Sequence, residues 1–119
     1  MIASYSNYLE CAAWSSTSED GEPLDSYQFS DAAEKEMCED LDNFVKELES
    51  NQELLNAYEN AGGTPEQFAH DFWLTRNHHG AGFWDRGLGE IGDILTALAH
   101  SFGGVDLYLN NETQEIEIY

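Results

Sequence analysis

The amino-acid sequence predicts an α+β fold in a single domain, with a small antiparallel sheet packed against three to four helices. Apolar residues recur at helical spacing through the middle of the chain, helix-start and helix-stop signals flank those stretches, and the last residues alternate apolar with polar. A length of 119 residues suits one domain covering residues 1–119, and 13% aromatic residues argue against a disordered acidic chain.

The sheet is expected to combine an N-terminal strand with a C-terminal hairpin. Residues 1–14 contain Tyr, Leu and Trp without Gly or Pro, which predicts a strand. Residues 15–29 gather Ser, Asp, Gly and Pro, which predicts a loop. Residues 105–109 and 115–119 alternate apolar and polar side chains on either side of a polar turn, which predicts a β-hairpin.

The clearest predicted helix covers residues 30–49. Ser30 is a favoured N-cap residue, and Asp31 adds a negative charge to the first turn, where the helix dipole favours it. Apolar residues then recur at the spacing of one buried helix face: Met37, Leu41, Phe44, Val45 and Leu48.

Three further helices follow from local signals. A short helix is expected over 52–60. Thr64 at the N-cap, Pro65 at the first position and Gln67 at the third match a capping box, so a second helix should begin there and stop near Asn77. A glycine-containing connection leads to a last helix over 88–102.

Net charge is the strongest functional signal in the chain. Asp and Glu number 24 against four Lys and Arg, a formal charge of −20. Solubility of a small domain needs a net charge of magnitude only about 2–8. Such a surface repels nucleic acid and anionic membranes, so neither is expected as a direct partner. It suits the basic groove of a nucleic-acid-binding protein, and we therefore predict a DNA mimic that inhibits such a protein.

The predicted helix over 30–49 carries two rows of carboxylates that could contact the basic groove of such a partner. One stripe holds Glu36, Asp40 and Glu47, and the opposite flank holds a second set. We predict these partner-binding carboxylates: Glu19, Asp20, Glu22, Asp25, Asp31, Glu36, Asp40, Asp42, Glu47 and Glu49. The alternative is an ordinary solvated helix face, with the charge serving only solubility.

Residues 70–86 concentrate aromatic and basic side chains. Both arginines lie near aspartates, which predicts internal ion pairs within the set Asp71, Arg76, Asp85 and Arg86. The functional alternative is a protein–protein adaptor or inhibitor in which Phe83 or Trp84 is an anchor in a partner's pocket.

A small metal-binding enzyme is the third class considered. His70, His79, Asp71 and Asp85 could supply ligands, but their spacing matches no zinc or calcium pattern, and His78–His79 is better explained as a helix C-terminal cap. Cys11 and Cys38 are expected to be buried free thiols. We therefore expect no enzyme, no catalytic residues, no metal site and no cofactor.

Several stretches resemble a family of small acidic proteins encoded by bacteriophages and prophages. The stretch YLECAAWSST (8–17) with GEPLD (21–25) resembles the family's start, HDFWLTRN (70–77) with GAGFWDR (80–86) its most recognisable block, and DLY (106–108) with the terminal hairpin fits too. The similarity covers nearly the whole chain. At His78 a Gly is more usual in the family, whereas His79 fits its pattern.

The resemblance implies a setting, namely a phage protein acting in the cytoplasm of a bacterial host. Small acidic phage proteins often counter host defence by imitating DNA, so the expected target is a restriction enzyme, a CRISPR effector or another nucleic-acid-binding host protein. The start of the chain has no apolar signal segment, which also favours a cytoplasmic location. The protein is expected to act as a monomer or a homodimer.

Overall fold

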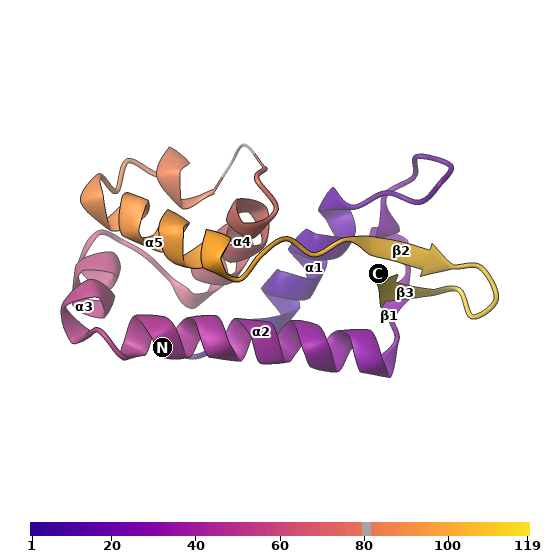
Figure 1. The fold of residues 1–119 in the computed structure, drawn as a ribbon, viewed down its shortest axis with the longest axis horizontal. Coiled ribbons are helices and arrows are strands. Elements are labelled where there is room, and N and C mark those ends of the chain that lie inside the picture. The colour runs from indigo at the N-terminus through magenta and orange to yellow at the C-terminus, as the bar shows by residue number, and fades with distance from the viewer. Residues whose placement is uncertain (80–81) are drawn as a thin grey trace.

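Residues 1–79 and 82–119 are described by the computed structural model, which has the expected α+β class (Figure 1). Residues 80–81, which the sequence places in the connection after the fourth helix, lie outside the described residues. The elements are α1 (Tyr5–Ser15), η1 (Leu24–Ser26), β1 (Gln28–Phe29), α2 (Asp31–Glu49), α3 (Gln52–Asn60), α4 (Pro65–Arg76), η2 (Phe83–Asp85), α5 (Glu90–Ser101), β2 (Leu107–Asn110) and β3 (Glu115–Ile118), where η marks a 3-10 helix.

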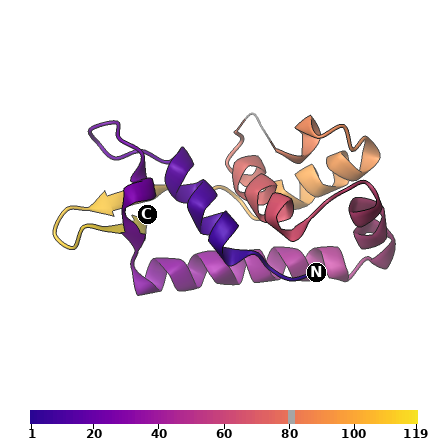
Figure 2. The same cartoon turned by 180° about the vertical axis from the view of Figure 1, so that it is seen from behind.

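Helix α2 runs along most of the molecule, whose extents are 47 × 24 × 22 Å (Figure 1). Helices α3, α4 and α5 gather around its C-terminal half, while the sheet lies beside its N-terminal end. Helix α1 crosses between these two parts, as the view from behind also shows (Figure 2). The long α2 is therefore the element that both parts share.

The prediction of an N-terminal strand is wrong, because residues 5–15 form helix α1. Tyr8, Cys11 and Ala12 are buried at the i, i+3, i+4 spacing of one helix face, Ala13 is buried beside them, and α1 packs on α4. The Tyr8 ring stacks on Phe72, with ring centroids 5.4 Å apart.

The sheet is mixed and has the strand order β1-β3-β2. The predicted hairpin is confirmed: β2 and β3 pair antiparallel, with Leu107 opposite Ile118. The third strand is not N-terminal but is β1, from the predicted loop 15–29, and it pairs parallel to β3 with Gln28 opposite Glu115. The expectation of a purely antiparallel sheet is therefore corrected.

The helices over 30–49, 52–60 and 64–77 are confirmed, together with their caps. The side chain of Ser30 accepts a hydrogen bond from the amide of Ala33, and the side chain of Thr64 accepts one from Gln67. The Ser30 hydroxyl also donates to Glu117 on β3, which connects the first turn of α2 to the sheet.

Aromatic side chains form the centre of the core. Phe44 of α2 stacks on Phe72 of α4, with ring centroids 4.0 Å apart, and also packs on Phe68, Phe83 and Phe102. All but Phe102 of these rings are fully buried, so one cluster holds α2, α4 and η2 together.

Helix α4 ends in a Schellman motif made by the histidines that the sequence assigns to a cap. The amide of His79 donates to the carbonyl of Leu74 at 2.8 Å, and that of His78 donates to Thr75 at 3.0 Å. His78 has a φ of 59°, in the left-handed region where glycine is normal. The cap therefore works through backbone amides.

Replacing His78 with glycine is expected to stabilise the protein by about 1 kcal/mol, because glycine removes the clash that a Cβ causes in a left-handed residue. Part of the gain is offset by the greater freedom of glycine in the unfolded chain and by the lost ring contact with His100, whose centroid lies 4.4 Å away. Urea denaturation measures the change. A His78→Ala control lacks the ring and keeps the Cβ, so a gain of equal size in that variant would contradict the explanation.

Candidate functional site

Both arginines of the chain bind carboxylates of the same chain. Asp71 is fully buried, and Arg86 donates two hydrogen bonds to its carboxylate, from Nε at 3.0 Å and from Nη2 at 2.9 Å. These bonds raise the pKa of Arg86, although partial burial opposes the charge. His70 Nδ1 also lies 3.1 Å from the Asp71 carboxylate. The buried carboxylate is therefore fully satisfied by its neighbours.

Arg76 holds four parts of the chain together. Its Nη1 donates to Tyr8 on α1 at 3.0 Å and to Asp40 on α2 at 2.8 Å. Its Nε and Nη2 donate to the carbonyls of Gly103 and Phe102, directly after α5, at 2.8 and 3.1 Å. The guanidinium carbon also lies 5.0 Å from the centre of the Phe72 ring. This arginine has a structural role.

The structure contains one ion pair within the predicted set and one that reaches outside it. Arg86 does pair with Asp71, but Arg76 pairs with Asp40, which comes from the acidic helix. Asp85 is exposed and forms no ion pair with any other described residue.

Three of the predicted phosphate-mimicking carboxylates have internal partners. Asp40 belongs to the Arg76 network, Asp42 accepts a hydrogen bond from Tyr5 at 2.6 Å, and Glu49 lies 2.7 Å from the N-terminal ammonium. Asp40 is 29% exposed and already pairs with Arg76, so it is less accessible to a partner than Glu36 and Glu47 of the same predicted stripe. The other seven predicted carboxylates are all exposed: Glu19, Asp20, Glu22, Asp25, Asp31, Glu36 and Glu47.

Little positive charge offsets this surface. Only Asp40, Asp71 and Glu49 of the 24 carboxylates form ion pairs with lysine, arginine or the N-terminus, so 21 have none within the described part of the chain. The two lysines, Lys35 and Lys46, are exposed on α2. Because both arginines already pair with carboxylates of the chain, the two lysines do little to offset the negative charge of the surface.

The aromatic block is mostly core. Phe83 is 0% exposed, and its amide donates to the Thr75 hydroxyl at 3.1 Å, so the prediction of Phe83 as a surface anchor is wrong. Its neighbour Trp84 is 56% exposed. The structure adds Trp14, at the end of α1, which is 63% exposed and which the sequence reasoning had placed in a strand.

The thiols and histidines do not assemble a reactive site. Burial, with a smaller contribution from Asp71, raises the pKa of Cys11 to about 12, so its thiol stays protonated at neutral pH. Burial also raises the pKa of Cys38, which is only half-buried, contrary to expectation. Within residues 1–79 and 82–119, no three His, Cys, Asp or Glu side chains are grouped to hold a metal ion.

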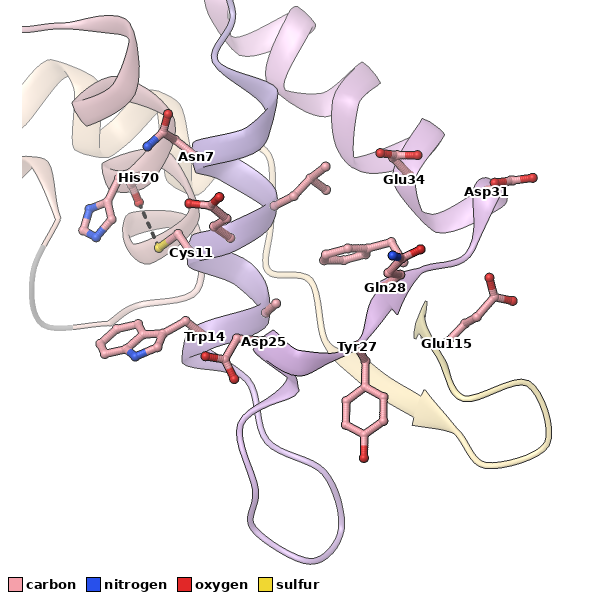
Figure 3. Close-up of a pocket in the computed structure, with 14 residues that line it drawn as sticks. Asn7, Cys11, Trp14, Asp25, Tyr27, Gln28, Asp31, Glu34, His70 and Glu115 are labelled. Carbon is pink, nitrogen blue, oxygen red and sulfur yellow. Dashed lines mark hydrogen bonds between the residues drawn. The ribbon is translucent and has the colours of Figure 1, made fainter.

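A groove of about 810 Å³ lies between α1 and the segment that runs through β1 into α2 (Figure 3). Trp14, Tyr27 and Phe29 line it together with five carboxylates, from Glu10, Asp25, Asp31, Glu34 and Glu115. A smaller hollow of about 400 Å³ lies where the loop with Glu19 and Asp20 faces strand β2. Sequence reasoning identified neither, because each is formed by segments distant in the chain.

Comparisons with family models, curated proteins and solved structures gave no match for this chain. The resemblance to acidic phage proteins therefore stays a prediction. Among the residues that the structure describes, no helix has the length and apolar character needed to cross a membrane.

Proposed function

We propose that this protein is a DNA mimic, which inhibits a nucleic-acid-binding protein of a bacterial host by occupying its basic surface. The observation that carries the proposal is the distribution of charge. Of 24 carboxylates, 21 lack an ion pair within the described residues, while both arginines bind internal carboxylates. A fold that needed its acids only for internal structure would pair more of them.

The density of charge is comparable to that of duplex DNA. A duplex as long as this molecule, 47 Å, carries about 28 phosphate charges at one charge per about 1.7 Å. The chain carries −20. A groove that binds DNA through Lys and Arg would therefore meet a similar field over a similar length.

The outer face of α2 and the loop before it supply the carboxylates for this role. Glu36 and Glu47 are exposed at positions about 16 Å apart along the helix axis, at a rise of 1.5 Å per residue. Glu39, which lies between these two residues along α2, is exposed as well and adds a third carboxylate. With Asp40 turned to Arg76, this outer set consists of Glu36, Glu39 and Glu47 on α2 and Glu19, Asp20 and Glu22 in the loop.

The proposal is tested by capturing the partner from bacterial lysate on the tagged protein, with and without excess duplex DNA. We expect a nucleic-acid-binding protein that DNA displaces, and whose dissociation constant rises steeply with salt. The triple variant Glu36→Lys, Glu39→Lys, Glu47→Lys should weaken binding by at least about 100-fold, since it reverses charges facing the partner's cations.

The matched control reverses three exposed carboxylates elsewhere, Glu59→Lys, Asp106→Lys and Glu112→Lys, which changes the net charge by the same amount. It should weaken binding by less than about tenfold, through the long-range field alone. A partner that stays bound in 1 M NaCl and excess DNA would overturn the proposal.

Exposed Trp84 favours a second candidate, a protein–protein adaptor or inhibitor that binds through this residue. Buried Phe83 leaves Trp84 as the member of the predicted anchor pair that a partner can reach. In that case Trp84→Ala would abolish capture, whereas the triple reversal on α2 would leave it intact.

A further inference from the structure

We propose that the groove between α1 and β1–α2 receives arginine side chains from a basic segment of the protein partner. The inference deepens the proposed function and rests on it for one point, that the partner is basic. It adds a specific contact site to the proposed function. A mimic that acted only through its long-range electrostatic field would need no such groove.

The floor of the groove is apolar. Leu9 and Ala13 from α1 and Phe29 from β1 line it. Ala13 is buried, while Leu9 and Phe29 are half-buried. Such a floor offers contact to the aliphatic stem of a long side chain, which loses water on burial.

The rim is acidic and has no cation to balance it. Glu10, Asp25, Asp31 and Glu34 are exposed and Glu115 is half-buried. None of the five carboxylates forms an ion pair or accepts a side-chain hydrogen bond within the described residues. His70, which also lines the groove, already contacts the Asp71 carboxylate. Charge complementarity therefore favours a cationic occupant.

Trp14 selects arginine over lysine as that occupant. The indole lines the groove and is 63% exposed, so a ligand in the groove can reach it. A planar guanidinium can stack on an indole and bind a carboxylate with two parallel hydrogen bonds at the same time, whereas an ammonium is a point charge with a tighter hydration shell. Carboxylates lie on the same groove for this second contact.

The test uses fluorescence of the Trp84→Phe variant, in which Trp14 is the exposed tryptophan, since Trp73 is buried. The probes are the capped peptides Arg-Leu-Arg-Leu-Arg, Lys-Leu-Lys-Leu-Lys and Glu-Leu-Glu-Leu-Glu. We expect the arginine peptide to change the emission saturably and to bind at least about threefold tighter than the lysine peptide, and the glutamate peptide to have no effect. A linear, unsaturable response to the arginine peptide would overturn the inference.

Two charge-matched double variants separate the groove from the overall field. Glu10→Gln with Asp25→Asn should weaken binding of the arginine peptide by at least about tenfold. Glu59→Gln with Glu112→Gln removes the same charge from exposed positions on α3 and in the β2–β3 turn and should change binding by less than about twofold. Equal losses in both variants would overturn the groove and would leave mimicry by the overall field intact.

The two proposals fail in different ways. If the partner from lysate stays bound in excess DNA and high salt while peptide binding still depends on Glu10 and Asp25, the groove proposal is supported and mimicry is overturned. If DNA displaces the partner while peptide binding is unchanged by the loss of Glu10 and Asp25, mimicry is supported and the groove proposal is overturned. Circular dichroism of each variant checks that the fold is intact.

Discussion

Substitution of Arg76 by methionine is expected to lower the free energy of unfolding by about 3 kcal/mol, a large share of the 5–15 kcal/mol typical of a domain. The guanidinium is almost fully buried and donates to Tyr8, Asp40 and the carbonyls of Phe102 and Gly103. Methionine fills part of the volume but leaves these acceptors without a donor. Urea denaturation followed by circular dichroism gives the loss.

Lys35→Met is the matched control, because it removes the same positive charge from an exposed position on α2. In a chain of charge −20, loss of any cation increases self-repulsion, and this variant measures that contribution alone. Its stability should change by less than about 0.5 kcal/mol. Similar losses in the two variants would mean that the Arg76 network adds nothing beyond charge.

Local signals made most of the helices predictable. Ser30 and Thr64 act as N-caps through their own side chains, and the apolar residues after Ser30 repeat at helical spacing over many turns. These features depend on neighbours within one or two turns of the chain, so no knowledge of the tertiary fold is needed.

Helix α1 was missed because its buried face is not marked by large apolar residues. Beside Tyr8 the face uses Cys11 and Ala12, and the large Trp14 is exposed, so the apolar pattern gives no clear period. Strand β1 was missed for another reason. It has two residues and exists because β3 supplies its hydrogen-bond partners, from a segment far along the chain.

The candidate site was predictable in kind but not in detail. Composition alone predicts an anionic surface, and the aspartates near both arginines in the sequence predicted that the arginines would form ion pairs with carboxylates. The choice of Asp40 for Arg76 depends on how α2 packs on α4, a contact between residues 36 positions apart. Only that packing shows which carboxylates remain free for a partner.

Phe83→Ala is expected to lower the free energy of unfolding by about 3–5 kcal/mol, the usual loss for a fully buried aromatic residue. The ring contacts Phe44, Tyr58 and Phe68, with centroids 5.9, 6.2 and 5.5 Å away, so its removal leaves a cavity in the central cluster. Chemical denaturation measures the loss.

The neighbouring Trp84→Ala is the control that separates core from surface within the same 3-10 helix. Its side chain is 56% exposed, so we expect a stability change below about 1 kcal/mol. Loss of partner binding in Phe83→Ala therefore reports unfolding, whereas loss in Trp84→Ala with an intact fold reports a contact. If the two variants lost equal stability, the assignment of Phe83 to the core and Trp84 to the surface would be wrong.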